Sequence, residues 1–258
     1  MLLCLDVGNT QIFGGVYDGD ELLATFRRTS NVRASADEFG TFFRAVLREN
    51  EVNPEAVTAA AICSVVPDVV HSLRNSFRKY FRFDPFILGP GAKTGLKIRY
   101  RNPLEVGADK VANALGGLIR FPGRNLLIVD FGTATTLCAV TKDREYLGGI
   151  ITPGIHTSMA ALEANTARLP VVEIVRPEDV LGRSTVESIQ SGLYYGTLAT
   201  VRWLIDSVTA RHFAADRPVV LGTGGFGRLF EEERLFDAFL PELPLIGLRR
   251  AVLLARGE

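Results

Sequence analysis

The chain holds few of the residues that build disulfide frameworks and metal centres, with three cysteines and three histidines among 258 residues. Cys4, Cys63 and Cys138 are odd in number, and each lies in an apolar run typical of a strand. We therefore expect reduced thiols in a protein core rather than disulfide bonds. No Cys or His cluster has the spacing of metal ligands, so a structural zinc site is not predicted.

The sequence also lacks a net charge and long apolar runs. Its 29 Lys and Arg residues balance its 29 Asp and Glu residues, so no overall basic field would attract nucleic acid or an anionic membrane. The longest apolar runs have the length of a strand, so we expect no membrane-spanning helix. Met1 leads directly into an apolar strand, so we expect no cleavable signal and a cytoplasmic location. The remaining composition is typical of a globular protein of one large or two small domains.

The chain opens on an apolar run, residues 1–5, that ends abruptly in the motif DVGNT. Five apolar residues without alternation predict a strand buried on both faces, and the motif predicts a tight turn. A carboxylate at the end of a buried strand, here Asp6, needs a cationic or hydrogen-bonding partner. Gly8 lets a ligand approach the backbone, while Asn9 and Thr10 offer neutral donors. The turn suits a phosphate chain and its Mg2+, although an ordinary hairpin explains the pentapeptide equally well.

The second half of the chain repeats this pattern. Residues 126–134 (LLIVDFGTA) align without gaps on residues 2–10, and residues 140–146 fall on residues 16–22. Two copies of a strand, an Asp-x-Gly turn and a returning strand indicate duplicated half-domains.

Helix signals occur at several points between and after these repeats. A capping box at Ser35 and a proline at residue 67 predict helix starts, and a short strand is predicted at residues 171–174. Asp109 lies in the first turn of a predicted helix, where the helix dipole stabilises its charge; this is also simply a favourable place for an Asp. The longest predicted helix, residues 186–212, carries Gly192 and Gly196 on one face. Each glycine costs about 1 kcal/mol there, so close packing is expected, either against a second subunit or within one.

Five motifs in one order resemble those of the type III pantothenate kinases, within the actin-like and sugar-kinase ATPase superfamily. They are DVGNT, GADK (residues 107–110), DFGTA (130–134), GGIITPG (148–154) and GRST (182–185). The resemblance extends from residue 1 to about residue 225. It implies an α/β fold of two duplicated ribonuclease-H-like halves, each a mixed sheet flanked by helices, with the active-site cleft between them. The expected divisions are an N-terminal half at 1–120, a C-terminal half at 121–244 and a closing helix at 245–258 that can return to the N-terminal half.

The same resemblance implies a transferase that phosphorylates pantothenate with ATP to 4'-phosphopantothenate, the first step of coenzyme A synthesis. It implies Mg2+, a monovalent cation (K+ or NH4+) and a homodimer, with Asp109 as the catalytic base. The implied ATP-binding residues are Asp6, Val7, Gly8, Asn9, Thr10, Gln11, Ile12, Phe13 and Thr133. The implied pantothenate-binding residues are Tyr100, Gly107, Ala108, Asp109, Lys110 and Thr185. Asp130 is implied to hold the monovalent cation, and Asp6 to hold Mg2+ through phosphates or water.

The chain departs from the family pattern at two positions. Lys110 stands where the family usually has Arg, and a Lys supplies charge without a bidentate fork. Gln11 stands where an Asn is expected. Two motifs allow more than one interpretation. GGIITPG fits either an anion site or an ordinary Gly-Pro turn. GTGGFG (residues 222–227) matches a dinucleotide pattern whose βαβ context is missing, so it resembles instead the adenosine-side loop of the kinases.

Two alternative functions remain at this level. One is another small-molecule kinase of the same superfamily, and the other is a non-catalytic regulator. The neutral charge and the lack of a helix-turn-helix signal argue against direct DNA binding. The presence of Asp6, Asp109 and Asp130 argues against an inactive enzyme.

Overall fold

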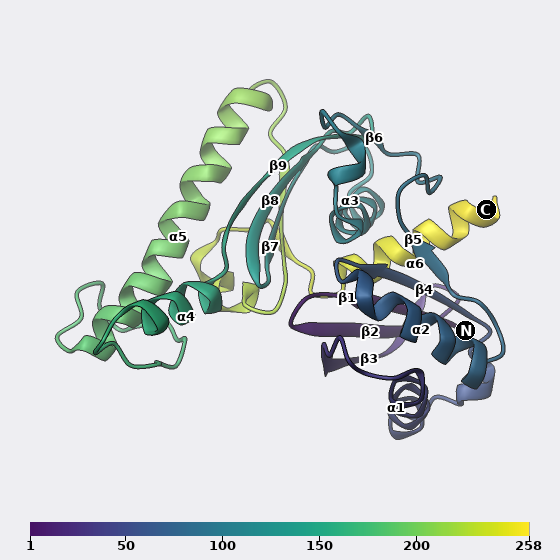
Figure 1. The fold of residues 1–258 in the computed structure, drawn as a ribbon. Helices are drawn as coiled ribbons and strands as arrows, with labels where there is room; N and C mark the ends of the chain where they lie inside the picture. Colours follow the sequence, from purple (N-terminus) through teal and green to yellow (C-terminus); the bar gives the residue numbers. More distant parts are fainter. Residues whose placement is uncertain (258) are drawn as a thin grey trace. The chain divides into compact units, whose positions relative to one another are not determined.

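A computed structural model describes residues 1–257, and the chain divides into two compact units (Figure 1). Unit 1 comprises residues 1–96 and 100–119 together with the chain from Leu243 onward. Unit 2 comprises residues 97–99 and 120–242. Each unit is built on its own sheet, and each is described separately below.

The sheet of unit 1 has five strands in the order β3-β2-β1-β4-β5. Their bounds are β1 Leu2–Val7, β2 Gln11–Asp18, β3 Glu21–Thr29, β4 Ala59–Ser64 and β5 Phe86–Leu88. The opening apolar run forms β1 as predicted. It pairs antiparallel with β2 and parallel with β4, which makes it the central strand.

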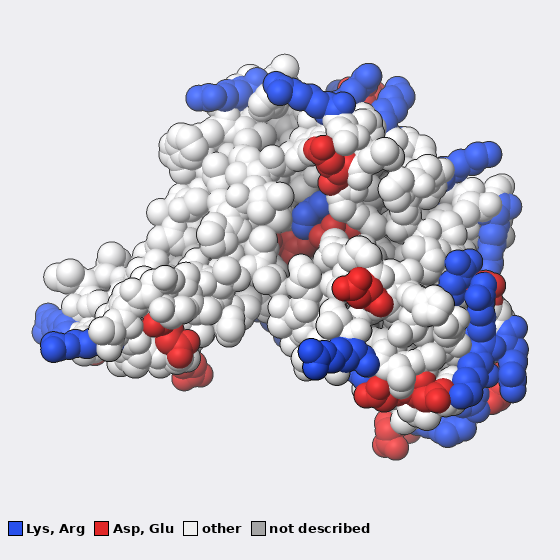
Figure 2. Space-filling view, viewed as in Figure 1, with Lys and Arg blue, Asp and Glu red and all other residues white. Residues whose placement is uncertain are grey.

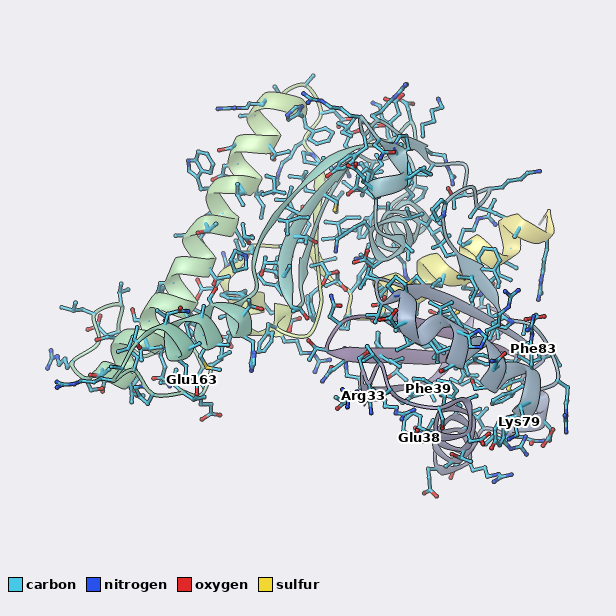
Figure 3. All side chains as sticks on the ribbon, viewed as in Figure 1. Arg33, Glu38, Phe39, Lys79, Phe83 and Glu163 are labelled. Atoms are coloured by element: carbon cyan, nitrogen blue, oxygen red, sulfur yellow. The ribbon has the colours of Figure 1, made fainter. Side chains whose placement is uncertain are left out.

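Helices α1 (Ala36–Glu49) and α2 (Pro67–Tyr80) pack together on one face of this sheet. The predicted capping box is confirmed, because the Ser35 hydroxyl accepts from the Glu38 amide at 3.2 Å and the Glu38 carboxylate accepts from the Ser35 amide at 2.8 Å. Figure 3 labels Glu38 and Phe39 on α1 and Lys79 on α2. Phe39 is fully buried, whereas Lys79 pairs with Asp37 across the two helices at 2.6 Å.

The basic residues near the end of α2 are neutralised locally. Arg74 and Arg78 both contact Asp84, at 2.9 and 2.8 Å, and Lys79 contacts Asp37. Figure 2 accordingly shows Lys and Arg atoms interspersed with Asp and Glu atoms over this part of unit 1. The surface is a solvated, mixed-charge face of the kind expected for a helix end.

Helices α3 (Ala108–Arg120) and α6 (Leu243–Arg256) pack against each other within unit 1. Helix α6 also lies on β1 and β4, on the sheet face opposite α1 and α2. The two helices approach so closely that a Cβ at Gly247 would stand 1.7 Å from the Ala112 carbonyl oxygen. A Cβ at Gly116 would stand 2.3 Å from the Leu243 carbonyl oxygen. The glycines therefore let two backbones touch, which fixes the start of α3 relative to β1 and β4.

The sheet of unit 2 has six strands in the order β11-β10-β7-β8-β9-β6. Their bounds are β6 Lys97–Ile98, β7 Leu126–Phe131, β8 Ala134–Val140, β9 Glu145–Pro153, β10 Val219–Thr223 and β11 Ala238–Phe239. Helices α4 (Ile155–Asn165) and α5 (Thr185–His212) pack on one face. Three short 3-10 helices, η1 Pro54–Ala56, η2 Pro103–Glu105 and η3 Gly227–Glu233, complete the chain.

The two sheets confirm the duplication inferred from the sequence. In unit 1 the antiparallel meander β1-β2-β3 is joined by parallel β4, and in unit 2 the meander β7-β8-β9 is joined by parallel β10. The second hairpin of each meander also carries a register irregularity, between Val16 and Tyr17 in one and between Ala139 and Val140 in the other. These positions differ by one residue in the sequence alignment of the repeats. The two halves are therefore copies of one α/β plan.

The predicted strand at residues 171–174 is wrong, because this segment is irregular. Val172 is buried in the core beside α5, and Ile174 packs against the same core. The backbone finds a different partner, since the Gln190 side chain of α5 donates to the Glu173 carbonyl at 3.0 Å. The alternating apolar pattern here reflects burial against a helix and not strand pairing.

Candidate functional site

The first cluster of predicted residues lies in unit 1 at the carboxyl end of β1. Asp6 is partly buried next to the turn that joins β1 to β2, and the turn is closed by a bond from the Gly8 amide to the Gln11 carbonyl at 3.0 Å. Asn9, Thr10 and Gln11 are exposed. The turn therefore presents polar side chains and backbone groups to solvent beside one carboxylate.

Three of the predicted ATP-binding residues face the core instead. Val7 and Ile12 are fully buried, and Phe13 is 8% exposed with the Arg27 guanidinium 4.2 Å above its ring. Their side chains serve packing, so any contact of theirs with a nucleotide would use the backbone.

Cys63, at the carboxyl end of β4, lies directly beside Asp6. The two residues are paired in the parallel ladder, and the Cys63 thiol donates to Asp6 Oδ1 at 3.1 Å. Burial raises the pKa of the Cys63 thiol well above its ordinary value, and the nearby Asp6 and Asp109 carboxylates raise it further. Both carboxylates therefore act on one buried, protonated thiol.

Asp109 lies in the first turn of α3, as predicted. Its Oδ1 accepts from the Lys110 amide at 2.8 Å and its Oδ2 pairs with Lys110 Nζ at 2.8 Å. The two side chains are only 20% and 17% exposed, so this ion pair is partly shielded from water. A side chain on Gly107 would overlap the carboxylate, because its Cβ would stand 2.4 Å from Asp109 Oδ1. Ala108 and Tyr100 are partly buried, Ala108 at the helix start and Tyr100 in the segment that leads to it.

The second cluster lies in unit 2 at the carboxyl end of β7. Asp130 is paired in register with Thr136 on β8 and with Thr223 on β10, which places the three side chains on one face of the sheet. Both threonine side chains are buried, and their hydroxyl oxygens find no hydrogen-bond partner among residues 1–257. Gly224 follows with φ of +89°, and a Cβ there would stand 2.6 Å from Asp130 Oδ1. Two buried hydroxyl groups on the same sheet face and a close glycine backbone are thus the neighbours that strand register gives to this carboxylate.

Thr133 lies in the turn after β7. Its carbonyl accepts from the Gly154 amide at 3.1 Å and from the Thr157 hydroxyl at 2.6 Å. A Cβ at Gly154 would stand 2.5 Å from the same carbonyl oxygen. The last glycine of GGIITPG, Gly154, therefore lets the start of α4 pack against the Thr133 turn. This packing explains the glycine without a bound anion.

Thr185 begins α5, after the Ser184 N-cap, and is exposed. Gly192, Gly196 and Trp203 follow on the same helix face, and Trp203 is 65% exposed. A Cβ added at Gly192 or Gly196 would meet no atom within 4 Å among the described residues. Packing of the glycine ridge inside the subunit, one of the two expectations, is therefore wrong for this part of the chain.

A cavity of about 180 Å3 lies elsewhere in unit 1, at the amino ends of β4 and β5. It is lined by Thr58, Ala59, Ala60, Phe83, Asp84, Phe86, Val252, Ala255 and Arg256. Asp6 and Cys63 lie at the opposite, carboxyl end of the strands. The carboxylates are therefore not part of this cavity.

Comparison with known proteins is decisive about the family. Residues 2–207 match the family model for type III pantothenate kinases. The chain belongs to the type III pantothenate kinase family. A protein named type III pantothenate kinase from Legionella pneumophila (strain Corby) is 52% identical over 98% of this chain and 99% of its own. Another so named from Elusimicrobium minutum is 48% identical over 98% of each chain.

Solved structures similar to this type III pantothenate kinase family member agree on the fold. A Campylobacter jejuni protein named for the Baf family of transcriptional activators superposes with a TM-score of 0.63 at 18% identity, over 99% of this chain and all of the other. A Sinorhizobium meliloti protein named as a 2-dehydro-3-deoxygalactonokinase gives 0.53 at 12% identity, over 98% and 96% of the two chains. At these identities the likeness concerns the fold alone.

Three residues beside the carboxylates were not predicted from the sequence, namely Cys63, Thr136 and Thr223. Cys63 lies 57 positions from Asp6 in the sequence, and the two threonines lie on strands that no local motif aligns with Asp130. Strand register alone brings these residues together. A signal was available for Cys63 and Thr223, because each falls at the carboxyl end of an apolar run, where neighbouring strands of such a fold place functional groups. Thr136 lies near the amino end of β8 and carries no such signal.

Proposed function

We propose that this chain transfers the γ-phosphoryl group of ATP to pantothenate, giving ADP and 4'-phosphopantothenate in the first step of coenzyme A synthesis. The observation that carries the proposal is the Asp109 carboxylate at the first turn of α3, held by Lys110 in a unit that also contains Asp6 and the DVGNT turn. Phosphoryl transfer asks a protein mainly for positioning, for charge neutralisation and for one group that orients the nucleophile. Family membership makes the chain a kinase and supports ATP as the donor.

Asp109 is the proposed base. It accepts the proton of the pantothenate hydroxyl as that oxygen forms its bond to the γ-phosphorus and the bond to ADP breaks. The carboxylate is 20% exposed and lies in the first turn of α3, so its position is set by the helix and it is partly shielded from water. Lys110 Nζ now occupies Oδ2, so the hydroxyl of the substrate would share or replace that contact.

The pantothenate site is proposed to use Tyr100, Gly107, Ala108 and Lys110 together with Thr185. Lys110 offers one ammonium group, which can pair with a carboxylate of the substrate as a point charge. It cannot form the bidentate pair that an Arg guanidinium forms with a carboxylate.

ATP is proposed to contact the turn from Gly8 to Gln11 and the Thr133 turn. Residues 1–257 hold no group of three Asp, Glu, His or Cys side chains arranged for a metal ion. Mg2+ usually binds through one or two carboxylates plus phosphate oxygens and water, so the single carboxylate of Asp6 fits a metal that arrives with ATP. The ion supplies charge neutralisation for the phosphates.

The monovalent cation is proposed to bind beside Asp130. The fit rests on the chemistry of the face: one carboxylate and the two buried hydroxyl oxygens of Thr136 and Thr223 that lack partners within the described chain. Oxygen ligands suit K+, and hydroxyl acceptors also suit NH4+. When bound, the cation would add positive charge near the phosphates.

A homodimer formed through α5 is also part of the proposal. The helix presents an open stripe that contains Gly192, Gly196 and the exposed Trp203. Small residues allow a second helix to approach, and an exposed Trp is a frequent anchor of protein interfaces. Thr185 begins this helix, so dimerisation and pantothenate binding would be linked.

A cytoplasmic location completes the proposal, supported by the three free and buried cysteines. Within residues 1–257, no helix combines the length and apolar character needed to cross a membrane.

The test is a phosphorylation assay with ATP, Mg2+ and K+ over a panel of alcohols that includes pantothenate. ADP release and the mass of the phosphorylated product are measured for each alcohol. The expected result is a phosphopantothenate product with the highest kcat/KM of the panel. Turnover of another alcohol with none of pantothenate would refute the substrate, and no ADP from any alcohol would refute the kinase.

A further inference from the structure

The Cys63 thiol contacts the Asp6 carboxylate, although the proposed reaction does not use Cys63. Cys63 is fully buried at the end of β4, and its Sγ lies 3.1 Å from Asp6 Oδ1. The parallel pairing of the two residues fixes both Cα positions, so the contact follows from the sheet itself.

Strand pairing positions the Asp6 backbone but leaves the rotation of its carboxylate open. A carboxylate that must meet Mg–ATP needs that rotation fixed, since the groups behind a metal or phosphate ligand determine its direction. A buried donor on the adjacent strand fixes it, because the thiol cannot turn to water and has one hydrogen to give.

The neutrality of the donor matters as much as its position. A Lys or Arg at residue 63 would cancel the negative charge through which Asp6 acts on a metal ion. A thiol donates without adding charge.

We propose that Cys63 is a positioning residue whose thiol holds the Asp6 carboxylate in the orientation that Mg–ATP requires. The inference rests on the proposed function through the role of Asp6 in nucleotide binding. It assigns no chemistry to Cys63, which acts through Asp6 alone.

The test compares three variants of the full chain. Cys63→Ala removes the donor, Cys63→Ser replaces it with a hydroxyl donor, and Cys4→Ala is the matched control. Cys4 is equally buried on β1, two residues before Asp6, so its truncation removes the same side-chain volume. Binding of a non-hydrolysable ATP analogue is measured by calorimetry with and without Mg2+, alongside kcat, KM for ATP and the thermal unfolding midpoint.

Loss of one hydrogen bond should weaken Mg2+-dependent analogue binding by about three- to tenfold in Cys63→Ala, with KM for ATP raised by a similar factor. Binding without Mg2+ should change little, Cys63→Ser should recover most of the loss, and Cys4→Ala should bind as the wild type does. If Cys63→Ala does not fold at the assay temperature, Cys63→Val fills the space without a donor and takes its place.

Equal Mg2+-dependent binding in Cys63→Ala and Cys4→Ala would overturn the inference, as would a serine variant no better than the alanine variant. Either result leaves the proposed function intact if the wild type still phosphorylates pantothenate. A wild type that binds Mg–ATP in a Cys63-dependent way but does not phosphorylate pantothenate would refute the substrate alone. A wild type that does not bind Mg–ATP would refute both.

Discussion

Gly247→Ala should destabilise the protein, although helix propensity by itself predicts the opposite. Gly247 lies inside α6, where exchanging glycine for alanine stabilises an exposed helix by about 1 kcal/mol. Here the new Cβ would stand 1.7 Å from the Ala112 carbonyl oxygen, whereas real Cβ contacts are essentially never shorter than 3.0 Å. The obstacle is backbone and cannot rotate away, so α3 and α6 must separate by at least about 1.3 Å.

Overpacking of this kind costs about 1–3 kcal/mol, and a rigid backbone obstacle places it at the upper end. Subtracting the propensity gain leaves a net loss of about 2 kcal/mol, or a fall of about 4–8 °C in the thermal midpoint for a chain of this size. The shift also displaces the start of α3, so kcat should fall as Asp109 moves.

Thermal and denaturant unfolding of Gly247→Ala would be compared with Gly192→Ala. Gly192 is a helical glycine whose added Cβ meets no atom within 4 Å in the described chain, so within one subunit it reports helix propensity. Because Gly192 also lies in the proposed dimer stripe, sedimentation of Gly192→Ala is measured alongside, and the comparison uses conditions in which both variants have the same oligomeric state. A midpoint for Gly247→Ala that equals or exceeds the wild-type value would refute the close packing of α6 on α3.

The other predictions concern the proposed reaction. Asp109→Asn should keep the ATP analogue binding but lower kcat by about a hundred- to ten-thousand-fold, since it removes the proton acceptor; near-normal turnover would exclude Asp109 as the base. Activity should require K+ or NH4+ in addition to Mg2+, and Asp130→Ala should weaken that requirement together with the rate. A full rate in Na+ buffer without K+ would eliminate the cation site. Gly196→Leu should convert a dimer into monomers and raise KM for pantothenate, as measured by sedimentation and kinetics; a wild type that sediments as a monomer at micromolar concentration contradicts the interface.

Features encoded by neighbouring residues could be predicted from the sequence. The capping box at Ser35, the helix start at Pro67 and the position of Asp109 in the first turn of α3 all follow from side chains within four residues. The duplication could be recognised because both copies keep an Asp and a Gly at the end of an apolar strand.

Features set by long-range register could not be predicted. The thiol of Cys63 contacts Asp6 only because β4 lies parallel to β1 in one register. Thr223 is paired with Asp130 for the same reason, through the register of β10 on β7. The apolar pattern of residues 171–174 predicted a strand wrongly. An irregular segment that buries every second side chain against a helix shows the same alternation of apolar and polar residues as a strand. Nothing in the motif GADK indicates that the Lys110 ammonium group pairs with the carboxylate of the adjacent Asp109.

The return of α6 to unit 1 has a consequence for how the protein is made. Residues 1–119 leave the ribosome first, yet the helix that covers one face of β1 and β4 begins only at Leu243. At about 5–20 residues per second, the intervening residues 120–242 take roughly 6–25 s to synthesise, ample time for unit 2 to fold. Unit 1 is therefore the first unit to be started and the last to be completed. Until α6 is made, the face of β1 and β4 that α6 covers lacks this helix. In a chain ended at residue 242, limited proteolysis should therefore cut within residues 1–119 and spare 120–242; equal resistance of both parts would show that unit 1 closes without α6.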